Sequence, residues 1–158
     1  MDIEWRQIKG YENYFVNKDG EIKNNKKGNI LKPRSNGCGY NIVDLSCKGI
    51  KKSHGIHRLI GMAFLENKNE KYDCIDHIDR NTQNNNLANL RWIDRSGNNR
   101  NKYIPNKHGY TGVYKKGDTF CSAIRGEKGK RIHLGTYATP EHAGEAYKKK
   151  YDEIMSIY

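Results

Sequence analysis

The most informative part of the chain reads Ile75-Asp76-His77-Ile78-Asp79-Arg80-Asn81, then Asn84-Asn85-Asn86-Leu87-Ala88-Asn89-Leu90-Arg91-Trp92, with Asn98 further along. Two short β-prone runs, at 76–79 and 90–93, flank an Asn-rich loop, and residues 94–101 can form a short helix after the second run. The stretch therefore predicts a strand, a loop, a strand and a helix in that order. Successive side chains on a strand point to opposite faces, so Asp76 and His77 can share one site only if the strand ends or bulges there.

Extended segments and turns lie on the N-terminal side of this unit. The Asp19-Gly20 step between β-prone residues 14–16 and 21–23 indicates a hairpin. Residues 40–45 alternate with period two, and apolar side chains recur at helical spacing from 57 to 64. These patterns predict a second hairpin followed by one short amphipathic helix.

A separate small module is predicted on the C-terminal side. Ile104-Pro105-Asn106-Lys107 is typical of a linker. Strand patterns follow at 110–115, 119–125 and 131–137, and Thr139-Pro140 then supplies a helix N-cap and a first-turn proline. An apolar stripe marks the helix face that packs on the strands: Ala143, Ala146, Tyr147, Tyr151 and Ile154. The pattern predicts a three-stranded antiparallel sheet packed on one helix.

Composition restricts the function. The 158 residues include 29 Lys and Arg and 18 Asp and Glu, a net charge of +11, and 35% hydrophobic residues. This charge favours nucleic acid as the partner. No apolar run reaches the length of a membrane span and no secretory signal is recognisable, so we expect a protein of a reducing cell interior. The four cysteines form no C-x-x-C pair, so no zinc site is expected.

The spacing of Asp76, His77, Asn89 and Asn98 resembles the HNH (ββα-metal) nucleases, in the phage homing-endonuclease branch where the final His is an Asn. The resemblance implies that His77 is the general base, that Asp76 and Asn98 hold one divalent cation, and that Asn89 either orients His77 or braces the loop. Asn99 and Asn101 remain alternatives to Asn98 as the ligand. Hard oxygen ligands suit Mg²⁺ or Mn²⁺, and an imidazole accepts a proton at neutral pH.

The flanking segments carry two further resemblances. Residues from Trp5 to Gly20 resemble the nuclease-associated modular domain that precedes HNH cores, and His57-Arg58-Leu59-Ile60 also fits the family, with Arg58 either contacting DNA or forming a structural salt bridge. Residues 109–151 resemble the ethylene-response-factor (APETALA-type) domain, whose sheet enters the major groove of DNA. Alternation of side chains places five residues on the predicted DNA face of this sheet: Arg125, Arg131, His133, Lys116 and Tyr114. Lys115, Lys116, Lys128 and Lys130 are expected on a solvated rim that attracts phosphate without reading bases, which for Lys116 is an alternative to a direct DNA contact.

These inferences combine into one prediction of an α+β modular protein. Its parts are a nuclease-associated module at 1–35, an HNH ββα-metal catalytic domain at 36–103 and an ethylene-response-factor-like domain at 104–158. The predicted activity is metal-dependent nicking of double-stranded DNA by a phage-type homing endonuclease acting as a monomer, or as a dimer for a double-strand break. The resemblance implies the cytoplasm of a bacterial or phage-infected host cell, and neither a membrane nor a small-molecule cofactor is expected as a partner. The alternatives are a catalytically inactive DNA-binding regulator on the same scaffold, and a structural or RNA-binding protein.

Overall fold

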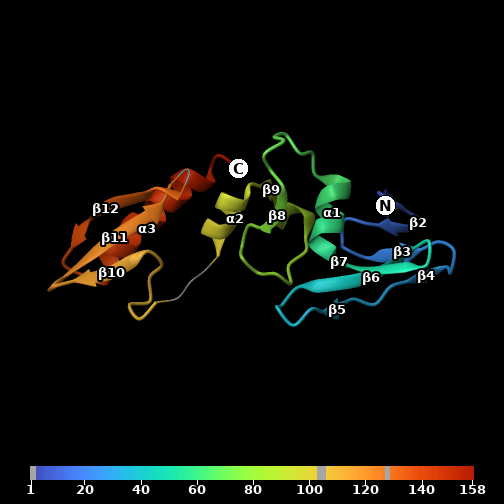
Figure 1. Ribbon diagram of the computed structural model, residues 1–158, viewed down its shortest axis with the longest axis horizontal. Coiled ribbons are helices and arrows are strands. Elements are labelled where there is room, and N and C mark those ends of the chain that lie inside the picture. Colours follow the sequence, from blue (N-terminus) through green and yellow to red (C-terminus); the bar gives the residue numbers. More distant parts are fainter. Residues whose placement is uncertain (1–2, 103–105, 127–128) are drawn as a thin grey trace. The chain divides into compact units, whose positions relative to one another are not determined.

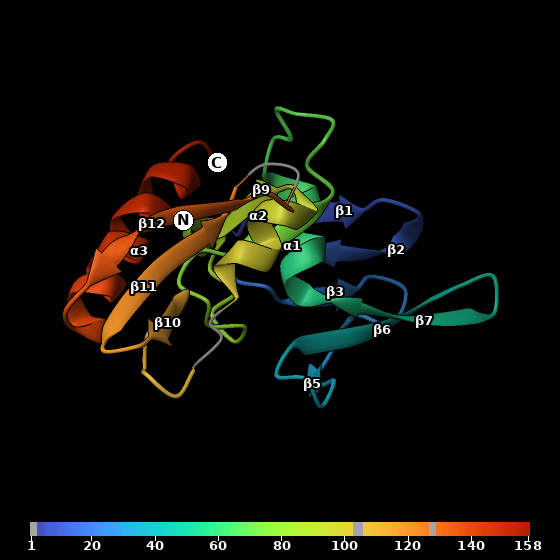
Figure 2. The same ribbon diagram turned by 60° about the vertical axis from the view of Figure 1, so that its left-hand side comes forward.

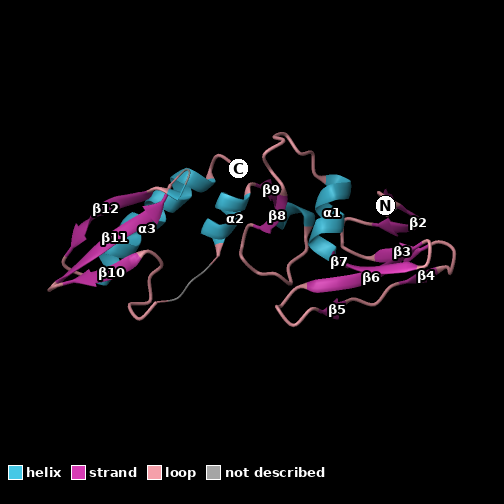
Figure 3. Ribbon diagram, viewed as in Figure 1, coloured by secondary structure: helices cyan, strands magenta, loops and turns pink. Residues whose placement is uncertain are grey.

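The computed structural model describes residues 3–102, 106–126 and 129–158. It divides into two compact units, Met1–Asp94 and Arg95–Tyr158, called here the first and second units. Short strands and loops dominate the first unit, whereas a long helix stands out in the second (Figure 3). The boundary between the units falls between the second strand of the predicted catalytic segment and the helix that follows it.

Antiparallel sheets of four, three and two strands make up the described part of the first unit, together with helix α1 (Figure 1). The four-stranded sheet comprises β1 (Arg6–Ile8), β2 (Tyr11–Val16), β3 (Ile22–Asn24) and β4 (Asn29–Ile30). The three-stranded sheet comprises β5 (Arg34–Ser35), β6 (Asn41–Cys47) and β7 (Ile50–Gly55), and β7 leads directly into α1 (Ile56–Phe64). The predicted hairpins and the predicted helix are therefore present.

Helix α1 joins these sheets through one hydrophobic core. It packs against strands of all three sheets, and the core contains Val16 from β2, Leu45 from β6 and Ile60 from α1, all fully buried. Gly61 allows α1 to lie close to β8, because a Cβ atom there would be 2.6 Å from the Ile75 side chain. Residues 3–35 and 36–94, which belong to segments predicted as separate modules, thus share a core within the first unit.

The two-stranded sheet consists of β8 (Cys74–His77) and β9 (Leu90–Ile93), antiparallel, with Asp76 opposite Arg91 and His77 opposite Leu90. The first strand lies two residues earlier than the predicted 76–79. It ends at His77 because the chain turns there, with Arg80 at φ +65° and its N–H bonded to the His77 carbonyl at 3.0 Å. The loop contains a turn of 3₁₀ helix at Leu87–Asn89.

The second unit contains α2 (Arg95–Asn101), a sheet of β10 (Val113–Lys116), β11 (Thr119–Arg125) and β12 (Arg131–Tyr137), and α3 (Pro140–Met155). Helix α3 runs along one face of the sheet and contacts all three strands (Figure 2). Strands β11 and β12 have their predicted bounds. Strand β10 begins after Gly112, a left-handed residue whose missing Cβ leaves room for the Tyr147 ring. Part of the predicted linker, and Lys128, lie outside the described residues.

Two further observations concern the whole described chain. No helix in its described residues has the length and hydrophobicity of a membrane-spanning segment. All four cysteines lie in the described part, and none of them forms a disulfide.

Candidate functional site

Strand β8 carries a buried ion pair at its C-terminal end. Asp76 is 7% exposed, and its Oδ2 accepts hydrogen bonds from Nε and Nη2 of Arg91 at 3.1 and 3.0 Å. Arg91 lies directly opposite Asp76 in the β8–β9 register, so the hairpin itself brings the charges together. The pairing supplies a buried carboxylate with hydrogen-bond donors.

His77 follows Asp76 at the point where β8 ends, and it is 3% exposed. Its Nε2 lies 3.0 Å from Oδ1 of Asn85, in the loop between β8 and β9. An amide oxygen can only accept, so Nε2 of His77 carries the hydrogen in this contact. Sequence reasoning missed Asn85, because nothing in a run of asparagines distinguishes the one that folds back onto the histidine.

A second histidine packs against His77. The rings of His57 and His77 are 4.9 Å apart between centroids, and Tyr40 lies 5.2 Å from His57 and 6.0 Å from His77. Burial lowers the pKa of His57 to about 4, with smaller contributions from its electrostatic interactions with His77 and Arg58. His57 Nδ1 is buried and has no hydrogen-bond partner. The uncharged side chain of His57 therefore lines this site at neutral pH, a role that sequence reasoning did not assign to it.

Asn89 holds the loop that follows His77. Its Nδ2 donates to Asp79 Oδ1 at 2.9 Å and to the Asn84 carbonyl at 2.8 Å, and its Oδ1 accepts from the Asp79 N–H at 3.0 Å. The hydrogen bond from the Asn84 side chain is the largest cause of a lowered pKa at Asp79, and bonds from Asn81 and Asn89 lower it further. These contacts favour the bracing role for Asn89 over the orienting one.

The residues predicted for the catalytic segment are distributed over both units. Asp76, His77 and Asn89 lie in the first unit, whereas Asn98 lies on α2 in the second. The pairing of Asn98 with Asp76 around a cation therefore stays a prediction. Arg58 is exposed on α1, and its contact with DNA also stays a prediction. The described residues contain no cluster of three or more His, Cys, Asp or Glu side chains that could hold a metal ion.

The sheet of the second unit gathers the other predicted residues on the face opposite α3. A hollow of about 390 Å³ on this face is lined by Tyr114, Lys116, Arg131 and His133. The Arg131 guanidinium stacks over the Tyr114 ring at 4.5 Å, and Arg125 lies opposite Arg131 in the register. A register shift after Ser122 in β11 places His133 opposite Ala123. The five sheet residues predicted to bind DNA thus lie close together.

Two segments of the chain match known family models. Residues 4–46 match the NUMOD4 motif and residues 54–100 match the HNH endonuclease family. The chain is 39% identical over 85 residues to an uncharacterized HNH endonuclease of Acanthamoeba polyphaga mimivirus, covering 54% of this chain and 26% of the relative. It is 37% identical over 97 residues to DNA endonuclease I-HmuI of Bacillus phage SP01, covering 61% of this chain and 55% of that protein.

The chain thus spans about a quarter of the mimivirus relative and about half of the phage enzyme. A solved structure, described as DNA binding and cleavage by the HNH homing endonuclease I-HmuI, matches with a TM-score of 0.59 and 27% identity. The match covers 99% of this chain and 93% of that one. Residues 54–100 accordingly match the HNH endonuclease family, and the mixed helix and sheet architecture is similar to that of a phage homing endonuclease.

Proposed function

We propose that this chain is a metal-dependent HNH endonuclease of the phage homing kind, which nicks double-stranded DNA by hydrolysing a phosphodiester. The observation that carries the proposal is the buried pair of Asp76 and His77 at the end of β8, within the segment that matches the HNH endonuclease family. The DNA-cleaving activity of I-HmuI, its relative and structural neighbour, supports the same conclusion.

His77 acts as the general base in this proposal. Asn85 fixes the hydrogen on Nε2, which leaves Nδ1 to take a proton from the attacking water. The neutral ring of His57 beside it limits the motion of the His77 ring. Asn89 contributes by keeping the loop, and with it Asn85, in place.

The donor chemistry at Asp76 fits a hard divalent cation. Mg²⁺ commonly takes one or two protein carboxylates and completes its coordination with water and phosphate oxygens, and Asp76 offers a carboxylate whose Oδ2 is oriented by Arg91. Such a cation, when bound, stabilises the charge that develops on the phosphate and the departing oxygen. Asp76 holds it in this proposal, and Mg²⁺ and Mn²⁺ both suit the site.

The second unit holds the substrate. Its three-stranded sheet and helix α3 support the proposal of an ethylene-response-factor-like DNA-binding domain, with α3 on one face and Arg125, Arg131 and His133 on the other. Arginines on such a face bind phosphates and guanine edges. One His77 per chain means that a monomer cuts one strand.

Plasmid nicking tests the proposal. Supercoiled plasmid should become open-circular with Mg²⁺ or Mn²⁺ and stay intact with EDTA. His77→Ala should lower the nicking rate by about 10²–10⁴-fold and Asn85→Ala by about tenfold, with DNA binding retained in a gel shift. Asn69→Ala, in an exposed loop, is the matched control. A His77→Ala variant that nicks at the wild-type rate would refute the assignment, and a wild-type chain that binds DNA without nicking it would favour the inactive regulator.

A further inference from the structure

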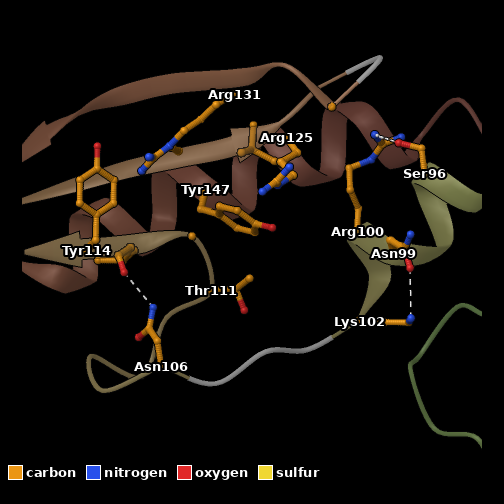
Figure 4. Close-up of a pocket in the computed structure, with 15 residues that line it drawn as sticks. Ser96, Asn99, Arg100, Lys102, Asn106, Thr111, Tyr114, Arg125, Arg131 and Tyr147 are labelled. Atoms are coloured by element: carbon orange, nitrogen blue, oxygen red, sulfur yellow. Dashed lines mark hydrogen bonds between the residues drawn. The ribbon is translucent and has the colours of Figure 1, made fainter.

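A cleft of about 690 Å³ lies within the second unit, between the α2 segment and the sheet (Figure 4). Arg125 and Arg131 line it from the sheet, and Tyr147 from α3. Arg100 lines it from α2, and Lys102 from just beyond that helix. Among the described lining residues four are basic and none is acidic.

The positive charge in this cleft is uncompensated by the described carboxylates. Arg100 donates from Nη1 to Ser96 Oγ at 3.0 Å and from Nη2 to Tyr158 Oη at 2.9 Å, and Lys102 donates to Asn99 Oδ1 at 3.1 Å. All these partners are neutral. By contrast, salt bridges to Asp or Glu hold other arginines of the described chain: Arg6, Arg34 and Arg91. The cleft therefore concentrates positive charge that is available to an anion.

The basic groups are also held in place. Arg100 is half-buried, with its Nε atom buried and without a hydrogen-bond partner. Two hydroxyl groups fix its terminal nitrogens, and the Tyr114 ring supports Arg131. Holding a charged side chain half-buried with an unsatisfied donor costs free energy, which an anion bound nearby would offset. Guanidinium groups fixed in this way suit phosphate oxygens, which they can bind through two parallel hydrogen bonds.

We propose that this cleft binds the sugar-phosphate backbone of duplex DNA, with Arg100 and Lys102 as phosphate contacts. The inference rests on the proposed function, because it extends the DNA-binding face of the sheet onto the α2 segment. Tyr114 and Arg131 line both this cleft and the neighbouring hollow that contains Lys116 and His133, so the two form one continuous basic surface. Contacts of this kind fix the position of a protein on DNA without reading its sequence.

Binding to a fluorescently labelled duplex in EDTA, where no cleavage occurs, tests the cleft. Replacing both Arg100→Gln and Lys102→Gln should raise Kd about tenfold near physiological salt and reduce the slope of log Kd against log salt concentration by about 2, one unit per lost phosphate contact. The matched control, Lys148→Gln with Lys149→Gln, removes the same charge from exposed positions on α3 outside the cleft. It should change the slope much less.

Arg100→Lys separates charge from folding, since it keeps the cation but loses the paired contacts with Ser96 and Tyr158. It should retain the wild-type salt slope; a slope reduced by about one unit, the change expected for the loss of one phosphate contact, would overturn the proposal. A double glutamine variant with wild-type Kd and slope would also overturn it, as would equal competition by duplex RNA. Plasmid nicking measured in parallel tests the enzyme itself: a wild-type chain that never nicks refutes the nuclease but leaves the cleft result standing.

Discussion

Acidification from about pH 7 to about pH 4 should destabilise the first unit through His57, and His57→Phe should remove this contribution. His57 is buried against His77, and its pKa in the folded chain is about 4, below the ordinary value of 6.5. Between these two values the unfolded chain binds a proton at His57 that the folded chain does not. Since the unfolded state then carries more protons, the free energy of unfolding falls as the pH falls through this window.

The size of the effect follows from the shift. A difference of 6.5 − 4, or 2.5 pH units, corresponds to about 3 kcal/mol at about 1.4 kcal/mol per unit. The full contribution is present above about pH 6.5 and is lost by about pH 4. The carboxyl groups with lowered pKa in the first unit, such as Asp44 and Asp79, are unchanged by the substitution, so their contributions cancel in the difference between wild type and variant.

Urea denaturation followed by tryptophan fluorescence measures this difference. The only two tryptophans of the sequence, Trp5 and Trp92, lie in the first unit, so their emission follows that unit. The stability of wild type relative to His57→Phe should decline by about 3 kcal/mol across the window. His54→Phe is the control: burial also lowers the pKa of His54, but less of its side chain is buried, so its effect should be smaller. A pH-independent difference between wild type and His57→Phe would refute the reasoning.

Two further predictions concern the stability of the first unit. Arg91→Leu leaves the carboxylate of Asp76 buried without its ion-pair partner and should lower the free energy of unfolding by about 3 kcal/mol, measured by urea denaturation. The double variant with Asp76→Leu should recover part of this loss. Wild-type stability in Arg91→Leu would contradict the prediction. Ile60→Ala removes a fully buried side chain and should lower the free energy of unfolding by about 2–5 kcal/mol. In single-tryptophan variants, Trp5 and Trp92 should report the same midpoint of urea denaturation. Separate midpoints would show that the core is not shared.

The elements that sequence predicted well are those whose signals are local. Strands β11 and β12 are β-prone runs separated by glycine-containing turns, which allowed their bounds to be predicted, and Thr139 caps α3 through the His142 N–H. The predicted position of β8 was wrong by two residues, because the chain turns after His77, with Arg80 in a left-handed conformation. A turn of this kind depends on the hydrogen bonds of the whole loop, and the sequence pattern alone does not reveal it.

The candidate site was only partly predictable for a related reason. Asp76 and His77 could be singled out from their spacing, but the groups around His77 come from separate parts of the chain. Asn85 reaches it across the loop, and His57 reaches it from α1, where a glycine at position 55 leaves room for the His57 ring. Helical periodicity identifies His57 only as one polar residue among apolar ones. Its burial, and therefore its lowered pKa, is a property of the packing.

Helix α2 illustrates the limit of local prediction most clearly. Its seven residues are shorter than a helix that is stable by itself in water, and none of its side chains is apolar. Contacts with the C-terminal part of the second unit hold it: Asn101 accepts a hydrogen bond from Tyr151, and Arg100 donates to Tyr158, 58 residues away. The sequence therefore predicts the helix correctly but not its partners. These tyrosine contacts also orient Arg100, so the basic cleft depends on the same long-range packing that stabilises α2.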